Sequence, residues 1–152
     1  MILEHFDPLI NIYDSHIGKN TKIANFVEVG GAFIGDDCKI QAFTSIPPGT
    51  TIGNRCFIGP GVRFPNSNYP SIGEGFEQLG STIEDDVVIG ANCIIMPGIT
   101  IGSGSFISAG VLVNKNIPAN SFVSVHRALN IKPISVLNIL RRWRERKHKK
   151  IY

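Results

Sequence analysis

The sequence contains no apolar run near the roughly 18 residues that a membrane-spanning helix needs. It shows no charged-then-apolar leader either, so we expect neither a membrane span nor a secretory signal. Cysteine is scarce: Cys38, Cys56 and Cys93 form an odd set, which argues against a disulfide framework and suits a reducing compartment. We therefore expect a cytoplasmic protein whose three thiols are small core residues rather than metal ligands or nucleophiles.

Positive charge is sparse outside one short segment. Seven of the 15 Lys and Arg residues lie in RRWRERKHKK, residues 141–150, which has one acid and carries +6. The rest of the chain has more acidic than basic residues, so the net charge of +3 describes a tail. Because the basic residues are confined to one end and no aromatic stacking platform accompanies them, we expect no nucleic acid partner.

An amphipathic helix is predicted at the C-terminus, over 134–152. Ile134, Leu137 and Leu140 recur at helical spacing, and Trp143 extends the stripe. We favour a helix that caps the open end of a repeat fold. The alternative is a basic helix that touches anionic lipid or the phosphates of a ligand, so membrane contact is considered but not favoured.

The chain is rich in a six-residue repeat. An aliphatic residue, often followed by glycine, recurs every six positions over 17–29, over 34–64 after one step of five, and over 83–113. Four places after most of these residues stands a second small or medium-sized one, so each hexapeptide has two inward positions. The second positions are Thr21, Val27, Cys38, Thr44, Thr50, Cys56, Val62, Val87, Cys93, Ile99, Ser105, Val111 and Ile117.

This period predicts a β-solenoid, since neither helical spacing nor sustained alternation fits it. In a parallel β-helix each hexapeptide is one flat face that cannot bury its apolar row alone. Stacked coils lie roughly 4.8 Å apart, one strand spacing, so equivalent residues form ladders inside. We therefore expect an all-β fold, with the solenoid over 1–133 and the C-terminal amphipathic basic helix over 134–152.

Fourteen residues, FPNSNYPSIGEGFE from Phe64 to Glu77, obey no period. We expect an excursion loop here, over about 64–82. A solenoid gains nothing by breaking its ladder, and long irregular segments in compact folds are usually functional. The loop is therefore the candidate site. The alternative is a loop that only pads a contact between copies of the chain.

Three stretches carry a resemblance to a known family: IGDDCKIQAFTSIPPGTTIGNRCFIGPGVRFPNSNYP (34–70), TIEDDVVIGANCIIMPGITIG (82–102) and ISAGVLVNKNIP (107–118). They resemble the hexapeptide acyltransferase superfamily. More narrowly, they resemble the N-acetyltransferases that modify the 3-amino group of nucleotide-linked amino sugars for surface polysaccharides. The resemblance covers about residues 10–125. It implies a left-handed β-helix, an exception to the usual right-handed crossover, and a homotrimer that binds acetyl-CoA in the groove between neighbouring subunits.

In this family the excursion loop walls the acceptor site, next to the neighbouring subunit. The family's Phe-Thr-Asn stretch matches Phe64, Pro65 and Asn66, with Pro65 in place of the threonine. Asn66 is accordingly expected to be catalytic, because its amide both donates and accepts hydrogen bonds, which suits a sugar amine or an acyl oxygen. The expected substrate-binding residues are Gln41, which is polar at a corner where glycine or alanine usually stands, Asn68 and Tyr69.

The resemblance also implies a cofactor site made of corner residues. The corner over 108–110 keeps the small residues along which pantetheine lies in the family, and Gly98 is expected to do so one coil earlier. The family closes its last coil with a Gly-x-Pro-Ala-Lys turn whose lysine meets a CoA phosphate, whereas this chain reads VHRAL over 125–129. A later basic residue or the tail is then expected to supply the charge. The expected CoA-binding residues are Gly98, Ser108, Ala109, Gly110, Arg127 and Lys132.

Histidine is too rare and too scattered for two other chemistries. His5, His16, His126 and His148 all lie outside the coil interior and the loop. Many O-acetyltransferases of the superfamily use a histidine base because a sugar hydroxyl is a very weak acid, and the zinc of β-helical carbonic anhydrases needs three converging histidines. An unprotonated amine, once positioned, attacks a thioester without such help.

We therefore expect an acetyl-CoA-dependent N-acetyltransferase that acts on a nucleotide-linked amino sugar by direct attack, with no histidine base and no metal. Two alternatives stay open. One is a sugar O-acyltransferase of the same superfamily. The other is a non-catalytic β-helix scaffold docked by its basic tail.

Overall fold

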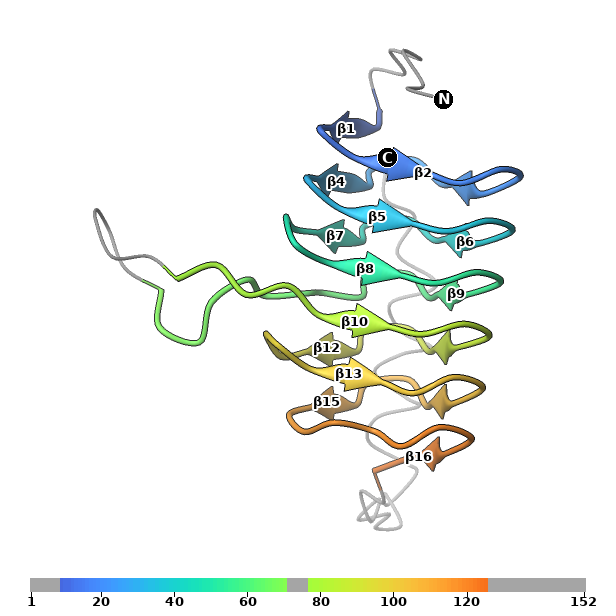
Figure 1. Ribbon diagram of the computed structural model, residues 1–152, viewed down its shortest axis with the longest axis vertical. Coiled ribbons are helices and arrows are strands. Elements are labelled where there is room, and N and C mark those ends of the chain that lie inside the picture. Colours follow the sequence, from blue (N-terminus) through green and yellow to red (C-terminus); the bar gives the residue numbers. More distant parts are fainter. Residues whose placement is uncertain (1–8, 71–76, 126–152) are drawn as a thin grey trace, which may run out of the picture.

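The computed structural model describes residues 9–70 and 77–125 and folds them into a stack of coils (Figure 1). All strand pairings are parallel and join equivalent strands of neighbouring coils, and none of these residues is helical. In Figure 1 the chain runs rightward along the near face, turns to the far side and descends, so the coil is left-handed. The expected left-handed parallel β-helix is confirmed. The helix predicted over 134–152 lies outside the described residues.

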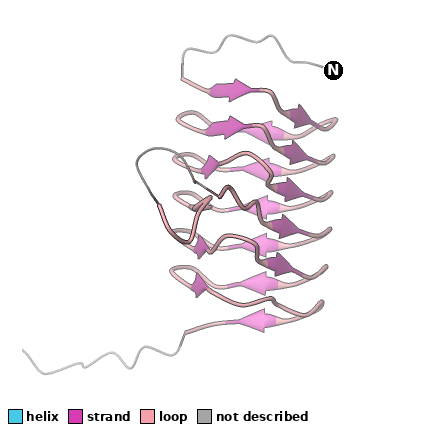
Figure 2. Cartoon of the chain, turned by 60° about the vertical axis from the view of Figure 1, so that its left-hand side comes forward, coloured by secondary structure: helices cyan, strands magenta, loops and turns pink. Residues whose placement is uncertain are grey.

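The strands form three flat faces, which Figure 2 shows from a second side. Face A contains β1 (Asn11–Tyr13), β4 (Glu28–Gly30), β7 (Ser45–Ile46), β12 (Ile94–Ile95) and β15 (Leu112–Val113), with Arg63 bridging β7 and β12. Face B contains β2 (His16–Ile17), β5 (Phe33–Ile34), β8 (Thr51–Ile52), β10 (Thr82–Ile83) and β13 (Thr100–Ile101). Face C contains β3 (Lys22–Ile23), β6 (Lys39–Ile40), β9 (Phe57–Ile58), β11 (Val88–Ile89), β14 (Phe106–Ile107) and β16 (Phe122–Val123).

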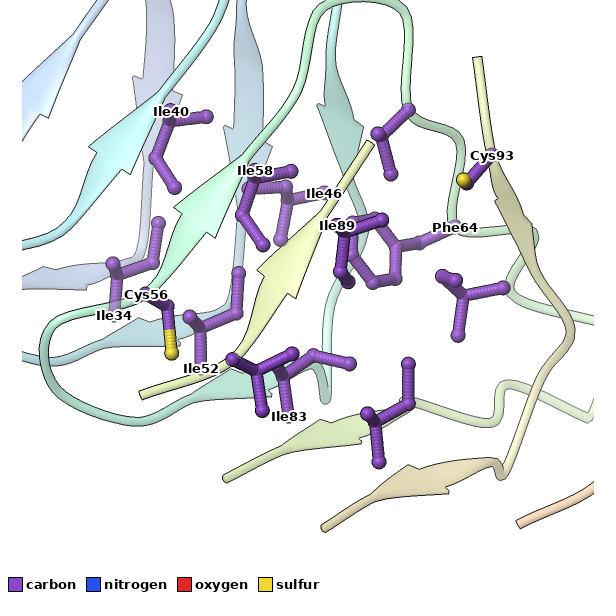
Figure 3. Close-up of a cluster of buried hydrophobic side chains, with 14 of the residues drawn as sticks. Ile34, Ile40, Ile46, Ile52, Cys56, Ile58, Phe64, Ile83, Ile89 and Cys93 are labelled. Atoms are coloured by element: carbon purple, nitrogen blue, oxygen red, sulfur yellow. The ribbon is translucent and has the colours of Figure 1, made fainter. Parts of the chain in front are cut away.

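The core is the inward ladder that the repeat predicts. Ten isoleucines, from Ile34 to Ile107, are at most 1% exposed, and Figure 3 shows several of them with Cys56, Phe64 and Cys93. Each buried isoleucine contributes on the order of 1.5–3 kcal/mol relative to an exposed one. All the predicted second positions are buried except Thr21, which is half-buried in the first turns of the stack. Ala32, which the sequence pattern missed, takes the inward place at the five-residue step.

The three cysteines lie inside the coils with free thiols, as expected. The Sγ of Cys93 donates to the carbonyl oxygen of Ser108 at 3.1 Å, and the Sγ of Cys56 donates to that of Glu84 at 3.0 Å. Burial raises the pKa of Cys93, which keeps its thiol protonated. These side chains are core residues, and Cys93 lies one coil after the root of the loop, where its carbonyl oxygen accepts a hydrogen bond from the N–H of Arg63 at 3.0 Å.

The corner between faces B and C carries a polar ladder. The Asn54 side-chain oxygen accepts a hydrogen bond from the backbone N–H of Asp36 at 2.8 Å, and the Asp85 carboxylate accepts one from the N–H of Asn54 at 2.8 Å. Beside them Arg55 pairs with Asp86 at 2.7 Å. At this corner, a side chain of each coil thus accepts a hydrogen bond from a backbone N–H in the turn of the coil before it.

Candidate active site

The excursion leaves the stack at the corner between faces A and B and returns to face B (Figures 1 and 2). Phe64, 4% exposed, is the last rung of the ladder before it, and Ser81, 2% exposed, is the first after it. The N–H of Leu79 donates to the carbonyl oxygen of Asn66 at 2.8 Å, which joins the outgoing and returning arms. The root of the loop is therefore fixed to the core, and the expected protruding loop is confirmed.

A pocket of about 200 Å³ lies between this root and face A. Strand register places Glu28 of β4 next to Ser45 of β7, and Ser45 next to Arg63. Pro47 and Pro48 form a wall whose backbone angles are fixed by their rings. The volume is below the roughly 300–1,000 Å³ of drug-sized sites. Its lining residues are Tyr13, Glu28, Ser45, Ile46, Pro47, Pro48, Phe64 and Asn66.

Of the four predicted acceptor residues, Asn66 lines this pocket and the other three do not. Gln41 follows β6 and lies at the corner between faces C and A, with β7 between it and the loop. Asn68 and Tyr69 lie further out on the loop, where the Tyr69 side chain is 88% exposed. Within one chain the structure does not bring Gln41 to the loop.

Three lining residues, Tyr13, Glu28 and Ser45, were missed by the sequence analysis. The Tyr13 ring lies against β4 because Gly30 has no side chain: a Cβ there would meet the Tyr13 hydroxyl oxygen at 2.3 Å. A signal for Glu28 and Ser45 was present. Each precedes an inward residue by one position, and Arg63, immediately before the loop, does the same. Glu28, Ser45 and Arg63 therefore occupy the same position in three successive coils.

The expected cofactor residues fall on two different corners. Gly98 lies between β12 and β13, at the corner of faces A and B, whereas 108–110 lies between β14 and β15, at the corner of faces C and A. The expectation that Gly98 occupies the same corner one coil earlier is wrong, because the register pairs Ile94 with Leu112 and so places Asn92 next to Gly110. The N–H of Gly110 accordingly donates to the carbonyl oxygen of Ala91 at 2.8 Å.

Both corners are nevertheless open. Gly98 and Gly110 have φ of 72° and 73°, and a Cβ on either would meet no atom of the described chain within 4 Å. Arg127 and Lys132 lie outside the described residues. A cation that the sequence analysis missed, Arg63, is exposed on face A and makes no ion pair with another described residue.

Residues 9–70 and 77–125 include no cluster of three or more His, Cys, Asp or Glu side chains able to hold a metal ion. They also include no helix long and apolar enough to cross a membrane.

Comparison with known proteins agrees with this architecture. The family model described as bacterial transferase hexapeptide (six repeats) matches residues 31–66 and 80–115. A hexapeptide-repeat-containing acetyltransferase from Vibrio cholerae is 30% identical, with a TM-score of 0.63, and the match covers 71% of this chain and 67% of that one. No curated protein sequence matches the chain.

Two more distant structures share the fold. PerB from Caulobacter crescentus, solved with CoA and GDP-perosamine, is 19% identical with a TM-score of 0.65, over 76% of this chain and 50% of that one. A variant of the N-acyltransferase AntD from Bacillus cereus, solved with dTDP-4-amino-4,6-dideoxyglucose and coenzyme A, is 19% identical with a TM-score of 0.68, over 91% and 86%. This chain thus spans half the length of PerB.

A parallel β-helix of hexapeptide coils with one excursion over a polar pocket defines a transferase of the hexapeptide class. The chain belongs to the family of hexapeptide-repeat acyltransferases.

Proposed function

We propose that the protein transfers the acetyl group of acetyl-CoA to the amino group of a nucleotide-linked amino sugar, in the cytoplasm and for the assembly of surface polysaccharide. The observation that carries this proposal is the pocket at the root of the loop, which is lined by Asn66 and one carboxylate and by no described histidine. Structures with this fold, PerB and AntD, hold CoA together with a nucleotide-linked amino sugar. The pocket volume fits the part of such an acceptor that carries the amine.

The described histidine does not favour hydroxyl chemistry. His16 lies in β2 on face B, and its ring stacks on Phe33 with centroids 4.6 Å apart. It is not among the residues that line the pocket. Since a hydroxyl needs a strong base and an unprotonated amine does not, this placement supports N-acetylation over the O-acyltransferase alternative.

A homotrimer would unite residues that one chain keeps apart. Three-fold contacts are heterologous, so one surface of a subunit faces a different surface of the next. The loop corner of one subunit would then face a second corner of its neighbour. In this arrangement Asn66, Asn68 and Tyr69 of one chain would join Gln41 of the other at the acceptor, and Gly98 would join Ser108, Ala109 and Gly110 along CoA.

Two measurements test the function. A ligand that binds only the native state raises the melting temperature, so acetyl-CoA should do so, and CoA release should follow when a nucleotide-linked amino sugar is added. Transfer to the hydroxyl-bearing counterpart alone would establish the O-acyltransferase. If acetyl-CoA does not raise the melting temperature and no acceptor causes CoA release, the non-catalytic scaffold is the remaining alternative.

A further inference from the structure

We infer that Glu28 is the residue that receives the proton of the acceptor amine and makes this pocket select amines over hydroxyls. The inference rests on the proposed function and adds to it a catalytic group from β4, two coils before the loop. Neither the family match, which begins at residue 31, nor the predicted acceptor residues point to Glu28.

Glu28 is the one charged side chain among the described residues that line the pocket. It is exposed on β4, and no ion pair or side-chain hydrogen bond joins it to another described residue. Arg63 lies two strand positions away on the same face, at roughly 10 Å along the sheet. The pocket therefore carries a net negative charge that nothing in it neutralises.

A concave site lined by charge of one sign concentrates ligands of the opposite sign. An amino sugar reaches the pocket largely as an ammonium ion, which an unpaired carboxylate attracts and orients. The other lining groups with polar side chains, Tyr13, Ser45 and Asn66, are neutral. The site thus matches a cationic amine better than a neutral hydroxyl.

The chemistry of transfer needs an acceptor for one proton. The ammonium ion first loses one proton to solvent. The neutral amine that results attacks the thioester carbonyl carbon, a C–N bond forms, and the carbonyl electrons move to oxygen. When the C–S bond breaks, its electron pair leaves with the CoA sulfur. The nitrogen, which is strongly acidic after attack, gives its extra proton to the Glu28 carboxylate, which passes it to the departing thiolate. Amine and acetyl-CoA become amide and CoA thiol.

The same group explains selectivity. A carboxylate is a competent base for the acidic nitrogen of the tetrahedral intermediate. It is far too weak to remove the proton of a sugar hydroxyl before attack, which is why hydroxyl transfer calls for a stronger base. A pocket with Glu28 and no histidine therefore turns over amines and leaves the hydroxyl counterpart unmodified.

The test compares Glu28→Gln with Glu28→Asp and with Glu84→Gln, a matched control that changes an exposed glutamate bonded to Ser103 at another corner. With acetyl-CoA and a nucleotide-linked amino sugar, Glu28→Gln should lower kcat roughly 100-fold or more, the usual size of a general-base contribution. The KM for acetyl-CoA and the melting temperature should stay near the wild-type values. Glu28→Asp should recover part of the loss.

Each outcome decides between the two proposals. If the wild type transfers acetyl to the amine but Glu28→Gln keeps the kcat of Glu84→Gln, the role of Glu28 is wrong and the proposed function stands. Equal wild-type transfer to the hydroxyl counterpart would overturn the selectivity. If the wild type acetylates no amine, the proposed function fails, and the role of Glu28 fails with it.

Discussion

Asn66 and Glu28 line one pocket from different elements, the loop and β4, and each is held in place by a different kind of contact. Asn66 is two residues beyond Phe64, whose buried ring fixes the root of the loop to the core. Glu28 is held by β4, which pairs with β1 on one side and β7 on the other. A buried anchor and a paired strand both limit movement of the side chain beside them, which a positioning site requires.

At this scale we predict the effect of Asn66→Ala. If Asn66 orients the amine or the developing oxyanion, the substitution should lower kcat roughly 10- to 1,000-fold, as loss of one positioned hydrogen bond does. The melting temperature should barely change, because the side chain is at the pocket and not in the core. Steady-state kinetics and thermal melts measure both.

Asn25→Ala is a matched control, since Asn25 is exposed at another corner and has no hydrogen bond to a described side chain. If the loop only pads a subunit contact, Asn66→Ala would weaken the oligomer while the remaining oligomer turns over normally. The assignment of the acceptor site to the loop would be wrong if Asn66→Ala and Gln41→Ala both left transfer to every tested amino sugar unchanged.

At the scale of the coil, stability is passed from one turn to the next. Repeat folds are stabilised by contacts between neighbouring repeats, and the corner of faces B and C shows how polar groups take part. The backbone N–H of Asn54 lowers the pKa of Asp85, and the Arg55 guanidinium lowers the pKa of Asp86. Both carboxylates are therefore bound more strongly in the folded chain when they are ionised.

This gives a pH dependence with a defined sign. A carboxyl group with a lowered pKa in the folded state stabilises the fold above its ordinary pKa and loses that effect as the pH falls through the folded value. Asp85→Asn should therefore lower the melting temperature at neutral pH by a few degrees or less, because the carboxylate is partly exposed and water screens its interactions. The gap to the wild type should narrow below the ordinary aspartate pKa and close once the pH is below the lowered pKa of Asp85.

Glu77→Gln, at an exposed carboxylate of the loop, is the control and should show no such trend. If the difference in melting temperature between Asp85→Asn and the wild type stayed constant down to low pH, the polar ladder would stabilise the fold by packing and hydrogen-bond geometry rather than by charge.

At the scale of the whole molecule, several exposed apolar groups indicate surfaces made for contact. Phe26 and Phe43 stack at the corner of faces C and A with ring centroids 5.3 Å apart, and they are 54% and 57% exposed. Both have φ of 63°, a conformation that is strained for a bulky residue. An exposed and strained aromatic pair suits an interface between subunits, in keeping with the proposed homotrimer.

The basic tail belongs to this scale as well. We predict that removal of residues 141–152 leaves an assembly of three shortened chains but raises the KM for acetyl-CoA, because the tail would supply positive charge for the CoA phosphates. The increase should be larger at low salt, where charges are screened less. Light scattering and kinetics at several ionic strengths measure the two effects. Unchanged kinetics at every ionic strength would show that the tail does not contact CoA and would favour a solvated capping helix.

The sequence by itself determined the coil, because a six-residue period with two inward positions can bury its apolar rows in a parallel β-helix and not in a helix or a flat sheet. It also located the loop, since the period stops there, and it singled out Asn66. Tertiary structure decided which residues share the pocket with Asn66. Tyr13, Glu28 and Ser45 come together through strand register, and Gly98 separates from Gly110 because its hexapeptide forms another corner of the triangle. A period of six gives the order of the faces along the chain. Which residues lie next to each other in neighbouring coils depends on how many residues make a full coil.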